Sequence, residues 1–317
     1  MADEIAKRRQ AYAAEITRRV SDPRIEAAFA AVPREDFAGP PPWRIGSGGL
    51  FGRTASDDAA RLYDDVLIAI DARRGINNGQ PSLHAQSIDA LRIKEGETVV
   101  QIGAGAGYYT AILAHLVGPA GKVVAYEIEP DIAERAKANL ARYSQVEVRA
   151  RSGVEDLPKS DAIYVNAAAT HPLRAWLDAL KVGGRLLFPL QAAHSTGAML
   201  LITRPESGDV WPARFLSAVV FIACEGAQDR ATGRKLDDAF RRGGLGQVRS
   251  LRFGGAPGQS DWLRGDGWAL TTDAAPGTKY CLATPACRSD VIHPASYALF
   301  MNLTGVRFSV QSPTARR

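Results

Sequence analysis

The chain has 317 residues, of which 46% are hydrophobic and 23% are charged, and its formal net charge is +5. This length allows one large domain or a domain with an appendage, and the composition supplies enough apolar side chains for a core. Because the positive charge is not gathered in basic runs, we expect no nucleic-acid partner. Because no apolar run is long enough to span a bilayer, we expect no membrane partner.

The cysteines and the first residues indicate a cytoplasmic protein. Cys224, Cys281 and Cys287 are too few and too scattered for a disulfide framework. Residues 1–9 are polar and lack the apolar core of a signal peptide. No pair of histidines has the spacing of metal ligands, so we expect no metal.

The first 85 residues are expected to form a helical cover with loops that face a substrate. Apolar residues recur at near-helical spacing in two runs, and the stretch after them is rich in glycine and proline. The expected elements are two helices within 4–31, a loop over 38–61, a strand over 66–70 and a helix over 82–91.

Residues 86–226 alternate between apolar strands and amphipathic helices, with short links. This alternation predicts a parallel, doubly wound sheet of the Rossmann type. Two further apolar strands predict an antiparallel hairpin at the edge of the sheet. Residues 227–317 change character and are expected to form a small α+β extension. The expected strands of the central unit are 98–102, 122–126, 146–149, 162–165, 185–189, 199–203 and 218–223.

A glycine-rich loop directly follows the first strand of this unit. Its three glycines, Gly103, Gly105 and Gly107, allow a sharp turn and let the backbone touch a ligand. Glu127 ends the next strand, where a carboxylate can accept hydrogen bonds from both hydroxyls of an adenosine ribose. The dinucleotide fingerprint places its third glycine one position later, at Tyr108. The spacing found here is instead typical of S-adenosylmethionine enzymes, although a tight turn without a ligand is the simpler alternative.

Six motifs together resemble the protein-L-isoaspartate O-methyltransferase family, over about residues 8 to 226. They are AVPREDF (31–37), YD (63–64), QP (80–81), QIGAGAGYYTA (101–111), DAIYVNAAA (161–169) and LKVGGRL (180–186). The resemblance implies a Rossmann-like class I methyltransferase with an N-terminal helical cover. It also implies S-adenosylmethionine as the methyl donor and S-adenosylhomocysteine as the product. The acceptor would be the α-carboxylate of isoaspartyl residues in peptides or proteins.

The resemblance also assigns the site, with several departures from the family pattern. Gly79 stands where the family has its active-site serine, and Gln101 stands where the family has an acidic residue. The adenine contact would fall to Ser152, in place of an aspartate, and the loop 191–197 is altered. The expected cofactor-binding residues are Gln101, Gly103, Gly105, Gly107, Tyr108, Glu127, Ser152, Gly153 and Asn166. The expected catalytic residues are Gly79, Gln80, His171 and His194.

The chemistry of the acceptor decides whether a base is needed. A carboxylate is ionised at neutral pH and needs none, whereas an alcohol, phenol or amine usually does. His171 and His194 are the candidate bases for such an acceptor, and His84 lies near the expected acceptor pocket. Each histidine can equally be structural. Tyr108 and Tyr109 can likewise pack the helix instead of touching a ligand.

Three functions remain open at this point. The first is methylation of a carboxylate on a peptide or protein. The second is methylation of a specialised peptide or small molecule, which Gly79, the altered loop 191–197 and the extension 227–317 favour. The third is a module that binds S-adenosylmethionine or its product without catalysis. The sequence does not indicate the oligomeric state.

Overall fold

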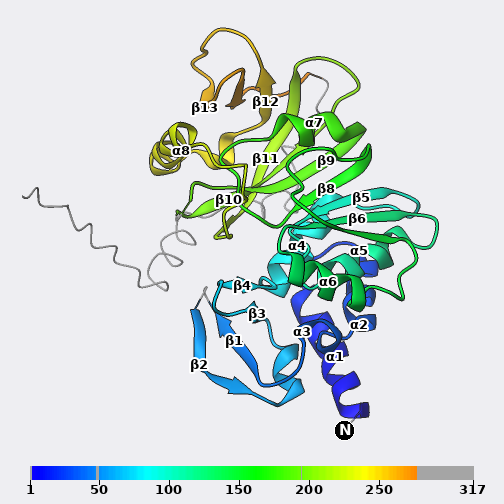
Figure 1. Ribbon diagram of the computed structural model, residues 1–317. Coiled ribbons are helices and arrows are strands. Elements are labelled where there is room, and N and C mark those ends of the chain that lie inside the picture. The colour runs from blue at the N-terminus through cyan, green and yellow to red at the C-terminus, as the bar shows by residue number, and fades with distance from the viewer. Residues whose placement is uncertain (1, 48–49, 194, 277–317) are drawn as a thin grey trace, which may run out of the picture.

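The structure is a computed structural model that describes residues 2–47, 50–193 and 195–276 (Figure 1). His194, Cys281, Cys287 and the stretch 277–317 of the expected extension lie outside the described residues. No helix within the described ranges combines the length and apolar character needed to cross a membrane.

The N-terminal cover consists of the two expected helices, α1 (Ala2–Ile16) and α2 (Pro23–Ala31), followed by the short α3 (Glu35–Ala38). Helix α2 begins at a proline, and the side chain of Asp22 accepts a hydrogen bond from the Arg24 N–H in the first turn. The apolar faces of α1 and α2 are buried against the central unit.

A small antiparallel sheet follows the cover, with strand order β2-β1-β3-β4. The expected strand at 66–70 is β3, but the expected loop over 38–61 is wrong because this stretch contains β1 and β2. The stretch is rich in glycine, proline and polar residues, so it lacks the apolar alternation that predicts a strand. Its strands are defined by their backbone pairing. The strands are β1 (Trp43–Ser47), β2 (Leu50–Ser56), β3 (Leu67–Asp71) and β4 (Ile76–Asn77), with the 3-10 turn η1 (Ala59–Tyr63) between β2 and β3.

The central unit has the expected doubly wound sheet. Five neighbouring strands in the order β9-β8-β5-β6-β7 are parallel, as the alternation of strands and helices predicts. These strands are β5 (Thr98–Ile102), β6 (Lys122–Glu127), β7 (Val146–Ala150), β8 (Ser160–Val165) and β9 (Leu180–Leu190). The helices around them are α4 (Pro81–Leu91), α5 (Tyr108–Val117), α6 (Pro130–Asn139) and α7 (Arg174–Ala179).

The extension continues this sheet instead of forming a sheet of its own. The expected hairpin is present and antiparallel, as β10 (Gly197–Thr203) and β11 (Val210–Val219). The expected position of its second strand, 218–223, is wrong, because the apolar run there continues past the end of β11, which starts at Val210 and pairs with β10 through less apolar residues. However, β12 pairs with β11, so the sheet runs on to ten strands in the order β13-β14-β12-β11-β10-β9-β8-β5-β6-β7. The added elements are α8 (Arg230–Arg242), the 3-10 turn η2 (Leu245–Gln247), β12 (Ser250–Phe253), β13 (Asp261–Arg264) and β14 (Trp268–Thr271).

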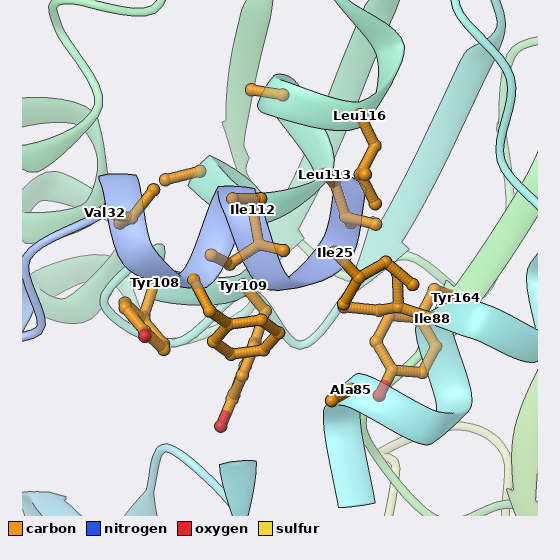
Figure 2. Packing of buried hydrophobic residues seen from close by; sticks show 14 of the residues in the cluster. Ile25, Val32, Ala85, Ile88, Tyr108, Tyr109, Ile112, Leu113, Leu116 and Tyr164 are labelled. Carbon is orange, nitrogen blue, oxygen red and sulfur yellow. The ribbon is translucent and has the colours of Figure 1, made fainter. Parts of the chain in front are cut away.

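Two apolar cores cover the two faces of the sheet. On one face, α2, α4 and α5 pack together, and Figure 2 shows Tyr109 and Ile112 of α5 beside Ile25 of α2 and Ile88 of α4. On the other face, α7 and α8 cover β9 to β12. The glycine loop therefore opens between a rigid sheet and the N-terminal cover.

Candidate active site

The glycine loop lies at the carboxyl end of β5, where β5 lies between β6 and β8. Ligands of doubly wound sheets bind at such a point because the flanking crossovers leave a crevice there. Gly103, Gly105 and Gly107 have φ values of +78°, +56° and +95°, which favour glycine. A Cβ at Gly107 would lie 2.7 Å from Cδ1 of Leu140, so packing also excludes a side chain there. The loop conformation requires the glycines that the sequence places in it.

Glu127 lies beside this loop, at the end of β6, as expected. One oxygen of its carboxylate accepts the Gly105 N–H at 2.7 Å, and the other accepts the Glu129 N–H at 3.1 Å. Burial raises the pKa of Glu127, and these N–H groups oppose the rise. A carboxylate offers about four acceptor positions, so two bonds leave others for hydroxyl donors. The loop and this carboxylate therefore fit the adenosine part of S-adenosylmethionine.

Gln101 and Asn166 form a buried link between β5 and β8. The amide of Gln101 donates to the side-chain oxygen of Asn166 at 2.9 Å, and the Thr110 hydroxyl donates to the Gln101 oxygen at 2.7 Å. Asn166 also lies against Gly103, whose added Cβ would be 3.5 Å from it. The structure thus places Asn166 beside the glycine loop, while Gln101 holds the Asn166 amide in position.

The other expected cofactor contacts have structural partners. A Cβ at Gly153 would lie 2.9 Å from Ile102, and the Gly153 carbonyl accepts the indole N–H of Trp176 at 2.9 Å. Ser152 is half-buried next to it. The Tyr108 side chain is buried in an aromatic cluster of the cover with Phe29, Phe37 and Tyr12, so it points away from the loop.

Gly79 and Gln80 lie where α4 begins. Gly79 has a φ of +71°, its N–H is bonded to the Asn77 side chain at 2.8 Å, and its carbonyl accepts the Tyr109 hydroxyl at 3.3 Å. The Gln80 amide donates to Asp65 at 2.7 Å, and Asp65 also accepts the Ser82 N–H in the first turn of α4 at 2.8 Å. Asp65 therefore fixes the start of this helix.

His84, one turn into α4, is the site residue that sequence reasoning left undecided. It is 2% exposed and stacks on Tyr109, with ring centroids 3.7 Å apart and planes 11° from parallel. Its Nδ1 lies 2.7 Å from the Tyr164 hydroxyl. Burial lowers the pKa of His84 to about 3, and the charge of Arg34 adds to the effect. The imidazole is therefore neutral at physiological pH.

Of the two histidines considered as bases, only His171 lies within the described residues, and it is near Asp229 of the extension. His171 follows β8, and its Nδ1 lies 3.0 Å from the Thr170 hydroxyl. Burial lowers the pKa of His171, while nearby Asp229, which caps α8, opposes the shift. His171 thus lies against the extension, and His194 is outside the described residues.

A buried arginine, which sequence reasoning did not single out, holds the segment before β3. Arg34 is 2% exposed, and its guanidinium donates to the carbonyls of Leu62, Asp64 and Val66, the last two at 3.0 and 3.1 Å. It also lies over the ring of Tyr12 at 5.4 Å from its centroid. The only signal for it was its place in the AVPREDF motif.

The sheet, the glycine loop and the acidic residue at the end of β6 define a Rossmann-like methyltransferase. A structure named protein-L-isoaspartate O-methyltransferase aligns with a TM-score of 0.58 and 24% identity, over 78% of this chain and 72% of that one. A second, from Plasmodium falciparum, in complex with S-adenosyl-L-homocysteine, aligns with a TM-score of 0.55 and 18% identity, over 68% of this chain and 98% of that one. Both likenesses support the fold.

The sequence comparisons identify the family. The family model described as protein-L-isoaspartate(D-aspartate) O-methyltransferase matches residues 53–228. Protein-L-isoaspartate O-methyltransferase 1 of Rhodopseudomonas palustris strain HaA2 is 35% identical over 65% of this chain and 78% of its own length. Protein-L-isoaspartate O-methyltransferase of Gloeobacter violaceus is 33% identical, over 60% of this chain and 87% of its own length. The chain belongs to the protein-L-isoaspartate O-methyltransferase family, whose members use S-adenosylmethionine. The expected family, fold class and cofactor are confirmed.

Proposed function

We propose that this chain catalyses transfer of a methyl group from S-adenosylmethionine to a carboxylate of a peptide or protein, with the isoaspartyl carboxylate as the first candidate. The observation that supports this most directly is the glycine loop with the Glu127 carboxylate bonded to the Gly105 N–H at 2.7 Å. Family membership supports the choice of acceptor. The three scattered cysteines of the sequence agree with a cytoplasmic site of action.

The cofactor would be held by the residues already described. Glu127 would accept the ribose hydroxyls, the loop 103–107 would let the backbone approach the ligand, and Asn166 would border the site from β8. Ser152, after β7, is the candidate for the adenine contact. When bound, S-adenosylmethionine supplies a methyl group on a positively charged sulfur.

The protein's task in the transfer is to align the acceptor oxygen with the methyl carbon. The carboxylate oxygen forms the new bond to carbon, the carbon–sulfur bond breaks, and the sulfur keeps the electron pair. No proton moves, because the acceptor is already ionised. A site without a general base is sufficient for this reaction, and the low pKa of His84 leaves that side chain uncharged beside the acceptor face.

A radiolabel assay tests the proposal. The full chain, an isoaspartyl peptide and labelled S-adenosylmethionine should give a base-labile methyl ester, while the same peptide with normal aspartate should give none. Incorporation that resists base would instead indicate a different acceptor group. Binding of S-adenosylhomocysteine without transfer to either peptide would favour a specialised acceptor or a non-catalytic module.

A further inference from the structure

The side chain of His84 occupies the space that a side chain at position 79 would need. A Cβ built on Gly79 would overlap Nε2 of His84 and lie 2.9 Å from its Cδ2. The imidazole cannot move aside easily, because it stacks on Tyr109 and bonds to Tyr164 through Nδ1. Positions 79 and 84 are therefore coupled: the histidine requires the glycine.

The hydrogen bonds around Nδ1 determine where the proton of the neutral imidazole resides. The Asn166 amide nitrogen, which can only donate, lies 3.5 Å from Nδ1, and its orientation is fixed by the bond from Gln101 to the Asn166 oxygen. The Tyr164 hydroxyl lies 2.7 Å from Nδ1 and can donate to the same nitrogen, so we assign Nδ1 as the acceptor. Because Nδ1 accepts, Nε2 carries the hydrogen.

This Nε2–H is buried, and it has no hydrogen-bond partner among the described residues. Gly79, which lies directly over it, is only half-buried. An unsatisfied buried donor is costly and calls for an explanation. A ligand oxygen that replaces the Gly79 backbone contact would satisfy it.

The position of this donor indicates which ligand it serves. His84 is joined to the glycine loop through Asn166, which lies against Gly103, and to the first helix after the loop through Tyr109. The ring therefore lies between the glycine loop and the turn before α4, with its Nε2 edge against Gly79. Phe221, between the exposed Val220 and Ile222, borders it from the end of β11.

We propose that His84 is the substrate-binding residue that holds the acceptor carboxylate, by donating Nε2–H to one of its oxygens. The inference rests on the proposed function for the identity of the acceptor. The Gly79 backbone lies over Nε2, so this bond forms when the acceptor oxygen takes the place of Gly79, and the polar group then comes from α4 instead of from position 79. The Nε2 proton stays on the imidazole, and the histidine acts as a donor and not as a base.

Steady-state kinetics with the isoaspartyl peptide tests the role of the donor. His84→Phe keeps a stacking ring without a donor, and His84→Gln places an amide N–H near the former Nε2. We expect H84F to raise the KM for the peptide about ten-fold or more and H84Q to recover part of it. The Kd for S-adenosylhomocysteine should stay within about two-fold in both. The matched control is His115→Phe, on the exposed side of α5, which should leave both constants unchanged. An unchanged peptide KM in H84F would overturn the inference.

The coupling of the two positions supplies a second test. Gly79→Ser alone should lose stability and activity, because its side chain meets the imidazole. The loss of stability caused by G79S should be smaller in the H84A background, because the clash is then absent while the strain of a side chain at a φ of +71° is the same in both. If G79S costs the same unfolding free energy in both backgrounds, positions 79 and 84 are not coupled and the inference fails.

NMR of the ¹⁵N-histidine-labelled full chain separates this inference from the proposed function. The resonances absent in H84F identify His84, and they should show an Nε2-protonated neutral ring whose signals shift when the peptide and S-adenosylhomocysteine are added. An Nδ1-protonated ring, or no shift with the peptide, would refute the role of His84 even if the wild type methylates. If the wild type does not methylate the peptide but the shift occurs, the proposed catalysis fails and the binding role stands.

Discussion

The imidazole of His84 lies flat on the phenol ring of Tyr109, with centroids 3.7 Å apart and an angle of 11° between the rings. This stack joins α4, which follows the turn at Gly79, to α5, which begins at the glycine loop. Because both rings are buried, a substitution at either one should perturb both the turn and the loop.

The depressed pKa of His84 predicts a loss of stability in acid. Below pH 6.5 the unfolded chain binds a proton at this histidine, but the folded chain does not until about pH 3. As the pH decreases from 6.5 to about 3, the free energy of unfolding should therefore decrease. This histidine contributes at most about 1.4 kcal/mol of that loss per pH unit. The charged group facing the ring is Arg34, and Tyr109 and Tyr164 are neutral there.

Urea titrations of the wild type and H84F between pH 4 and pH 8 measure this effect. The difference between the two proteins isolates His84 from the other histidines, because those titrate in both. The free energy of unfolding of the wild type, relative to that of H84F, should decrease as the pH falls below 6.5. Parallel pH curves would show that His84 is not the titrating group.

Replacing Glu127, the last residue of β6, should weaken cofactor binding. Glu127→Gln removes the charge and turns one acceptor into a donor that faces the N–H of Gly105 or Glu129. We expect the Kd for S-adenosylhomocysteine, measured by calorimetry, to rise by about 10- to 100-fold. Glu134→Gln, on the exposed face of α6, removes only an ion pair with Lys137 and should leave the Kd unchanged.

The ion pair between Arg185 and Glu97 should contribute strongly to stability. Both side chains are about 85% or more buried, and the Arg185 guanidinium also donates to the carbonyls of Leu91, Arg92 and Asp161. Arg185→Met would leave a buried carboxylate unpaired, which costs about 3–5 kcal/mol of unfolding free energy.

The exposed pair between Arg174 and Asp178 provides a matched control for the previous prediction. These side chains are 75% and 57% exposed, so Arg174→Met should change the unfolding free energy by less than about 0.5 kcal/mol. Denaturant titration of both variants compares the two pairs directly. Equal effects would mean that burial does not decide the strength of these interactions.

Arg34 should be required for the fold of the segment before β3, residues 62–66. Arg34→Met removes donors to the carbonyls of Leu62, Asp64 and Val66 and should cost about 2–4 kcal/mol. Arg34→Lys should recover little, because an ammonium group cannot reproduce the planar fork. Thermal unfolding tests this, with Arg61→Met, which pairs with Asp64 in solvent, as the variant expected to behave like wild type. Full stability in R34K would contradict the prediction.

The parts of the site that could be predicted from sequence depend on residues that are close together along the chain. The glycine loop directly follows one buried strand and Glu127 ends the next, so their spacing alone places them at one edge of the sheet. The strands β1 and β2 could not be predicted, because their glycine and polar residues give no apolar alternation and the strands are recognised only by their backbone pairing. The role of His84 was out of reach because it depends on Tyr109 and Tyr164, which come from other elements.

The continuation of the sheet into the extension has a consequence for how the chain can be divided. Strand β12 pairs with β11 at Val210, Trp211 and Pro212. A fragment ended near residue 226 would leave those backbone groups open to other chains, which is a route to aggregation. Within the described residues, the outermost strand on this side of the sheet is instead β13. This strand is short and carries two charged residues, Asp261 and Arg264, which are features that disfavour edge pairing. The added strands therefore occupy a part of the sheet edge that could otherwise pair with another chain.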